Sequence, residues 1–354
     1  MVSVKNLIYV ILFFSICLNS SCSKFGYLMN QSSGQAKILF GGIDNKEVLE
    51  DPKVDPKIKK KIRNIAKHKK YFYEYWKKPA TDIYEETYFL KNKAVTYLVI
   101  ASPFNEIKPK KECFLFMGCF PYLGFFDESD AKEHAQDLVK EDWVTYIRPV
   151  YAYSTLGYFD DNILSSFFYY NDIDLAELVF HELFHTIFFV KDDIELNENM
   201  ANYFGKQMSY EYFEKKDKEI EEAKDLDKRR GQVKKVIVEQ VKALNKLYKS
   251  NNSLDKSKSE ELFENYMQET FLPAVNLACK RFKVNNCNFV SKKWNNASLA
   301  AFLTYQNKIE NFEKLKVKLG LNLRDFFLYI ESKYKEFKKN RPKKKTFDQF
   351  LFEN

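Results

Sequence analysis

The sequence predicts a mainly helical α+β fold, in which helices flank a small sheet. Long segments such as Tyr210 to Lys249 interleave Lys with Glu in a helix-like pattern. Two short segments, Lys93 to Pro103 and Trp143 to Tyr153, are instead rich in β-branched and aromatic residues, which is typical of strands. The 354 residues are 45% hydrophobic and include only ten Gly and nine Pro, so a disordered or collagen-like chain is excluded.

The N-terminus is predicted to direct export. Lys5 precedes an apolar run from Leu7 to Leu18, and small polar residues follow up to Cys22. This is the pattern of a secretory signal, and the run is too short for a comfortable transmembrane helix. Cys22 resembles the lipidated cysteine of a bacterial lipobox, although Asn19 takes the usual apolar place. We therefore expect a lipid-anchored protein on the periplasmic or cell-surface side. Ordinary cleavage nearby and an uncleaved anchor are the alternatives.

The chain divides into four predicted regions. They are a lipoprotein signal peptide (1–22), an N-terminal helical region (23–92), an α/β core (93–212) and a C-terminal helical region (213–354). In the helical region, Ile62 and Ile65 lie at helical spacing in a Lys-rich run. In the core, Pro149 indicates that its strand lies at a sheet edge or carries a bulge, because proline cannot donate to the ladder.

Four cysteines remain once Cys17 and Cys22 are assigned to the signal. They form two locally spaced pairs, Cys113 with Cys119 and Cys279 with Cys287. Export to an oxidising compartment favours two disulfides, and buried thiols are the alternative. Neither pair has the C-x-x-C spacing of a zinc ribbon.

The charge balance indicates a solvated surface. The net charge of +8 results from 57 Lys and Arg against 49 Asp and Glu, so both signs are plentiful. There is no compact Arg-rich patch and no aromatic–basic motif, and we therefore expect no nucleic-acid partner. A contribution to membrane-surface binding stays open.

The sequence His181-Glu182-Leu183-Phe184-His185 is an H-E-x-x-H motif. It lies in a predicted helix from Asp172 to about Val190. A spacing of four places both imidazoles on one helical face, where they can bind one Zn²⁺, and Glu182 beside them can accept a proton from a metal-bound water. A helix with two histidines satisfied by other partners is the alternative. The other two histidines, His68 and His134, are expected on helix surfaces.

A catalytic zinc site needs a third protein ligand and an open position. The chain is expected to turn at Asp192 and Asp193 and to start a second helix near Leu196. Glu198 would then lie in the first turn of that helix, within reach of the metal, and Asn202 one turn later could support a ligand by a hydrogen bond. Alternatively, Glu198 is a first-turn acid that the helix dipole favours.

The block from Val150 to Gly205 resembles the predicted bacterial aminopeptidase family of zincin-like metallopeptidases. Tyr153 to Asp161, the H-E-x-x-H motif and Asn197-Glu198 carry the resemblance. Weaker similarity covers most of the mature chain. The resemblance implies a zincin-like core, exported lipoprotein members, and zinc bound by His181, His185 and Glu198 with Glu182 as the base. Thr186 and Asn162 depart from the family pattern without touching the ligands.

The remaining catalytic roles are less specific. Tyr153 and Tyr305 are candidates for stabilising the oxyanion because each lies in a block that resembles the family, although packing roles would also explain them. Val150 to Ser154 could bind substrate backbone by strand addition, or could be a plain core strand. Asp160 and Asp161 are expected to cap a turn, with binding of a substrate amine as the alternative.

These observations lead to three hypotheses. The first is a zinc metallopeptidase, and specifically an aminopeptidase, that acts on peptides. The second is a catalytically silent, membrane-anchored lipoprotein that uses the fold as a binding scaffold; the presence of Glu182 argues against it, because a structural zinc site needs no base. The third is a zinc hydrolase of a non-peptide amide.

Overall fold

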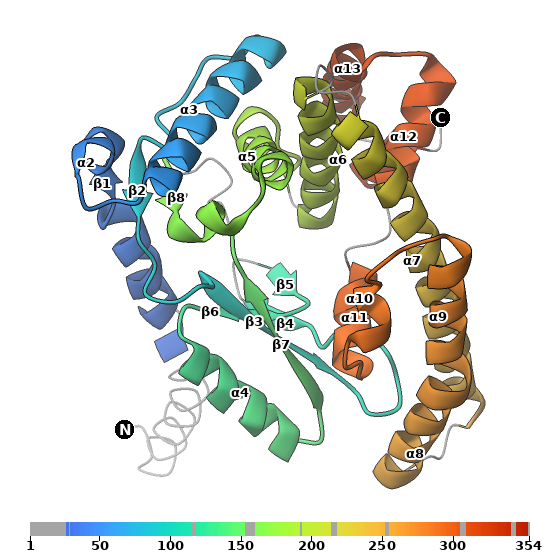
Figure 1. The fold of residues 1–354 in the computed structure, drawn as a ribbon. Coiled ribbons are helices and arrows are strands. Elements are labelled where there is room, and N and C mark those ends of the chain that lie inside the picture. The colour runs from blue at the N-terminus through green and yellow to red at the C-terminus, as the bar shows by residue number, and fades with distance from the viewer. Residues whose placement is uncertain are drawn as a thin grey trace, which may run out of the picture.

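The computed structural model describes residues 26–27, 29–114, 118–152, 160–191, 193–213, 218–251, 255–304, 309–340 and 345–352. It confirms a mainly helical α+β fold, with 68% of the residues helical and several small sheets (Figure 1). Cys22, Tyr153 and Tyr305 lie outside the described residues. Residues 29–40 are helical and precede the first labelled strand. No helix in the described part is both long and apolar enough to cross a membrane.

The labelled helices follow the chain in this order: α2 (Asn45–Glu50), α3 (Pro56–Trp76), α4 (Glu128–Lys140), α5 (Asp172–Ile187), α6 (Ile194–Phe213), α7 (Lys218–Ser250), α8 (Lys256–Tyr266), α9 (Leu272–Arg281), α10 (Asn288–Ser291), α11 (Asn296–Thr304), α12 (Ile309–Leu319), α13 (Leu323–Asn340) and α14 (Phe347–Phe352). The strands are β1 (Ile43–Asp44), β2 (Glu86–Tyr88), β3 (Thr96–Ser102), β4 (Glu112–Phe114), β5 (Gly118–Phe120), β6 (Leu123–Phe125), β7 (Val144–Val150) and β8 (Ile163–Leu164).

An antiparallel sheet of order β6-β3-β7 forms the lower part of the molecule in Figure 1. Its two faces are covered by different helices, because successive strand residues point to opposite sides. Tyr97, Val99 and Ala101 pack toward α4 in one cluster, whereas Leu98 and Ile100 pack toward α11 in another. The long strand β7 is an edge strand of this sheet, which accommodates Pro149 as expected.

The largest core lies between α3, α5, α6 and the C-terminal helices α12 and α13. Aromatic rings fill it: Phe184 of α5 stacks on Phe204 of α6 at 4.8 Å between ring centroids, and Phe327 of α13 packs edge-on against both. Such pairs stabilise the core beyond the area that they bury. Of the two remaining small sheets, β1-β2-β8 adds Ile163 and Leu164 of β8 to this core, whereas the β4-β5 hairpin contributes none of its described residues.

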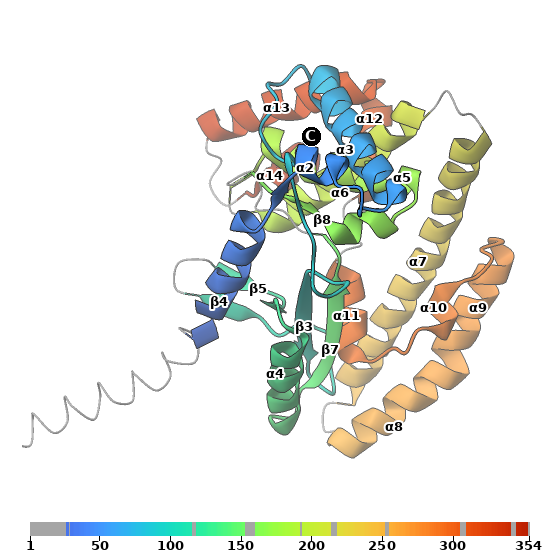
Figure 2. The ribbon, with the colours of Figure 1, turned by 60° about the vertical axis from the view of Figure 1, so that its left-hand side comes forward.

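The helices α7 to α10 form an arm with a separate hydrophobic cluster (Figure 2). The cluster joins Val233, Ile237 and Val241 of α7 to Phe271 and Val275 near α9. A disulfide links Cys279 in α9 to Cys287 before α10, and a second one links Cys113 to Cys119 across the β4-β5 hairpin. Both are the pairs expected from the spacing in the sequence.

The surface position predicted for His68 was wrong. This residue of α3 is 3% exposed, and its ring packs edge-on against Phe180, Tyr212 and Phe213. The Lys-rich run around it suggested a solvated helix, but one stripe of that helix faces α5. His134 of α4 is half-buried beside the ring of Phe125.

Candidate metal centre

The helix α5 forms because a capping residue fixes its start and apolar residues at helical spacing give it a face that can be buried. Asn171 caps the helix by accepting a hydrogen bond from the backbone N–H of Asp174 at 2.8 Å. Asp172 and Asp174 in the first turn complement the helix dipole. Leucine, valine and phenylalanine side chains at helical spacing then bury the opposite face in the large core.

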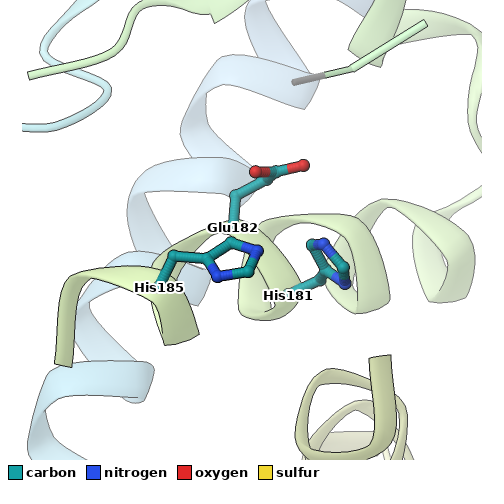
Figure 3. A group of neighbouring side chains, drawn as sticks. All are labelled: His181, Glu182 and His185. Atoms are coloured by element: carbon teal, nitrogen blue, oxygen red, sulfur yellow. The ribbon is translucent and has the colours of Figure 1, made fainter. Parts of the chain in front are cut away.

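The two histidines and the glutamate of the H-E-x-x-H motif come together on α5 (Figure 3). Their potential ligand atoms lie within 4.8 Å of one another. His185 and Glu182 are 4% and 5% exposed, so both are held in a largely water-free environment, and His181 is partly exposed. Figure 3 shows the carboxylate of Glu182 set to one side of the two imidazoles.

Glu198 approaches the same two imidazoles from α6. Its Oε2 lies 3.6 Å from Nε2 of His181, and its Oε1 lies 3.4 Å from Nε2 of His185. The helix begins at Ile194, slightly earlier than predicted, because the carboxylate of Asp193 accepts a hydrogen bond from the N–H of Leu196 at 3.0 Å. The residue predicted as third ligand is therefore brought to the two predicted histidines.

Two features of α6 hold Glu198 in this position. Gly205 faces the backbone of α5 so closely that a Cβ there would lie 2.8 Å from the amide nitrogen of His181. The buried amide of Asn197 accepts a hydrogen bond from the N–H of Val190 and donates one to its carbonyl oxygen, at 2.8 and 2.7 Å. The first feature permits close helix packing, and the second ties the end of the α5 segment to α6.

The electrostatics of the three side chains are strongly coupled. Burial lowers the pKa of His181, but the adjacent Glu198 and the charges of Glu182 and Glu177 outweigh this effect and raise it to about 9. Burial and the charge of His181 lower the pKa of His185 to about 4. Burial opposes ionisation of Glu198, but His181 and His185 lower its pKa. Metal binding would thus require His181 to lose a proton. His185 is already the neutral imidazole, and Glu198 the ionised carboxylate, that a metal ion binds.

The donor set fits a zinc ion. Zinc–ligand bonds of about 2.0–2.1 Å in a tetrahedron separate neighbouring donor atoms by about 3.3 Å, close to the separations of 3.4 and 3.6 Å between the imidazole Nε2 atoms and Glu198. In the described part of the chain neither ring nitrogen of buried His185 makes a hydrogen bond. An unpaired buried polar atom is costly, and a metal bound at Nε2 would satisfy one of the two nitrogens.

A cavity of about 1190 Å³ opens beside this group. His181 and Glu182 line it from α5, Asn202 from α6, and the end of β7 with Tyr151 and Ala152 from the sheet. The edge strand for which strand addition by a substrate was one of two alternatives therefore borders the same space as the predicted base. Asn202 lies in the cavity wall beside His181 rather than in a buried position.

A model of the family described as "Putative aminopeptidase" matches residues 26–346. The chain belongs to this family. The match covers most of the chain and includes the H-E-x-x-H helix and Glu198, and the family's description supports a peptidase. A search of curated proteins and a search of solved structures each found no match.

The residues at which this family member departs from the expected pattern have structural roles. The hydroxyl of Thr186 donates to the carbonyl of Leu183 and bonds with Tyr73 of α3. The buried amide of Asn162 donates to the carbonyl of Ile38 at 2.6 Å, which attaches the N-terminal helix. Asp160 and Asp161, which were expected to cap a turn, do not line the cavity in the described part of the chain.

Several charged residues of the cavity wall were not predicted from the sequence, among them Glu177 and Lys206. Glu177 lies one helical turn before His181, and this spacing was a readable signal for the same helix face. Lys206 follows Gly205 in α6, and only the packing of α6 and α7 against α5 places it in the cavity.

Proposed function

We propose that this protein is a zinc-dependent metallopeptidase that acts as an aminopeptidase. The observation that carries the proposal is the approach of Glu198 to Nε2 of both His181 and His185, with Glu182 beside them at the wall of a large cavity. His181, His185 and Glu198 would hold the metal. A structural zinc site is closed by four protein ligands, whereas three ligands next to a cavity leave a position for water.

Each residue has a role in hydrolysis. Bound zinc would lower the pKa of its water and polarise the scissile carbonyl. Glu182 accepts the proton of the attacking water and delivers it to the leaving amine, and its burial keeps the proton from bulk solvent. The edge strand β7 and the segment up to Ala152, which line the cavity, would align the peptide backbone. Tyr153 and Tyr305 stay candidates for stabilising the oxyanion.

The mechanism is tested with the mature protein and the variant Glu182→Gln. We expect one zinc per chain in both, and a loss of kcat of about 10²- to 10⁴-fold in the variant, because only the proton transfer is removed. His185→Gln should lose zinc, whereas His134→Gln on α4 should keep it. Equal activity of Glu182→Gln and wild type would contradict the mechanism, and zinc binding without turnover would favour the binding scaffold.

The mode of cleavage and the location need separate tests. A set of peptides with free and acetylated N-termini distinguishes the two modes, since an aminopeptidase should fail on the acetylated set. We further propose export and membrane anchoring through a lipid on Cys22, with the site on the periplasmic or cell-surface side. Palmitate labelling should occur in the wild type and be absent in Cys22→Ala; equal labelling would contradict the anchor.

A further inference from the structure

Glu177 is a cavity residue whose position the proposed chemistry does not explain. It lies one helical turn before His181 on α5, and it lines the same cavity as His181 and Glu182. Residues four apart on a helix lie above one another on one face. A group bound by Glu177 would therefore be a near neighbour of the reacting atoms.

The cavity is acidic although the chain as a whole is basic. Its described lining has six acidic residues, namely Asp172, Asp174, Glu177, Glu182, Glu219 and Asp227. Four basic residues face them: Lys61, Arg148, Lys206 and Arg230. This surplus of two acids contrasts with the net charge of +8 for the whole chain. The described lining is thus mixed in charge, and its small excess of acidic residues favours a cationic ligand over an anionic one.

Among the described residues, the lysine that forms an ion pair with Glu177 is also engaged by another carboxylate. Lys206 Nζ lies 2.7 Å from Oδ2 of Asp227 but 3.7 Å from Oε1 of Glu177, which is beyond hydrogen-bond distance. Tyr210 also donates to Asp227, which completes that pair. Asp172 is likewise paired with Lys61 at 2.7 Å. In the described part of the chain one lysine is thus shared by two carboxylates, and this lysine compensates the charge of Glu177 only in part.

The burial of Glu177 makes the incomplete compensation of its charge more costly than it would be in water. Burial raises the pKa of Glu177, an effect that Lys206 and His181 oppose and that the charges of Asp227 and Asp174 reinforce. The side chain is nevertheless 31% exposed, and it lines the cavity. A ligand cation that entered would supply the missing charge and a hydrogen-bond donor, and charge-assisted hydrogen bonds are among the strong ones.

We infer that Glu177 determines specificity by binding a cationic group of the peptide next to the scissile bond. The inference rests on the proposed function, because it places the substrate in the cavity beside His181. An ammonium or guanidinium group is the shared chemistry. Its source is either the free α-amine of the substrate or a Lys or Arg side chain next to the cleaved bond, and the experiment below separates the two.

The experiment measures binding, so that it does not depend on turnover. The zinc-loaded full chain carries Glu182→Gln in every sample, alone or combined with Glu177→Gln or with the control Glu219→Gln. Glu219 also lines the cavity but is exposed and lies at the start of α7. The probes are one neutral peptide with an acetylated N-terminus and an amidated C-terminus, the same peptide with a free N-terminus, and blocked versions with Lys in the central positions.

We expect Glu177→Gln to weaken binding of at least one cationic peptide by about 10- to 100-fold, and to leave the neutral peptide within about threefold. Glu219→Gln should leave the preference for cations unchanged. A loss confined to the free-amine peptide assigns the α-amine as the ligand, and a loss confined to the Lys peptides assigns the side chain. An unchanged ratio of cationic to neutral Kd in Glu177→Gln overturns the inference. Zinc content and wild-type turnover, measured alongside, report on the proposed function independently.

Discussion

The α5–α6 pair and the arm of α7 to α10 are both helical, but they are held together differently. In the α5–α6 pair, helix backbones touch at Gly205, aromatic side chains fill the core, and the described residues of the two helices include no disulfide. The arm has a smaller cluster of its own and a disulfide between Cys279 and Cys287. The candidate metal centre depends on the first arrangement, because donor atoms from two helices must meet within a few tenths of an ångström. Among the described residues of the arm, those at the start of α7 line one wall of the cavity.

The largest expected effect on the site comes from Gly205→Ala. A Cβ at this position meets backbone atoms of His181, which cannot rotate away, so α6 must shift and carry Glu198 with it. We expect a loss of stability of about 1–3 kcal/mol and a fall in zinc affinity of about 10- to 100-fold. Titration with a competing chelator and urea unfolding measure the two effects.

Gly231→Ala is the matched control for this substitution. Gly231 lies within α7, and a Cβ there meets nothing within 4 Å. The variant should keep its zinc affinity and gain about 0.5–1 kcal/mol of stability from the better helix propensity of alanine. If the two glycine variants bound zinc equally well, the close approach of α6 to α5 would not determine the site.

The buried His68 makes the stability of the largest core depend on pH. Burial lowers its pKa to about 4, with smaller effects of Asp172, Lys61 and Lys67. Because the unfolded chain takes up this proton near pH 6.5 and the folded chain only near pH 4, stability is complete above pH 6.5 and is lost as the pH falls through that window. The loss is about 3 kcal/mol at the lower limit.

The variant His68→Phe should lack this part of the acid destabilisation. Urea unfolding of both proteins between pH 4.5 and 7.5 measures the difference, and His134→Phe, at a half-buried position, should change the slope less. Identical pH slopes for wild type and His68→Phe would show that the buried ring does not resist protonation in this way.

The smallest effect on the site is expected from the arm. Replacing Cys279 and Cys287 together by Ser opens a short loop and should lower stability by about 2–3 kcal/mol. Zinc affinity should stay within about twofold of the wild type, because no residue of α9 or α10 lines the cavity in the described part of the chain. A coupled loss of zinc would show that the arm and the α5–α6 pair do not act as separate units.

The sequence predicted those features that depend on local spacing. The four-residue spacing of His181 and His185, the turn at Asp193 and the choice of an edge or a bulge at Pro149 can each be read within one short segment. The burial of His68 could not be predicted from local spacing. A Lys-rich helix pattern occurs both in helices that are exposed all round and in helices that bury one face. The position of Glu177 on the same helix face as His181 could be predicted from the spacing, but its incomplete pairing with Lys206 could not.

The sequence by itself determined the helix that carries His181, Glu182 and His185, and the residue expected to join them, since helical geometry relates residue number directly to direction in space. Only the tertiary structure decided that Glu198 reaches both imidazoles, because that distance depends on how closely α6 packs at Gly205. It also decided that Lys206 is engaged by Asp227 and leaves Glu177 partly uncompensated. Contacts between helices depend on the packing of the whole core, and no local spacing encodes them.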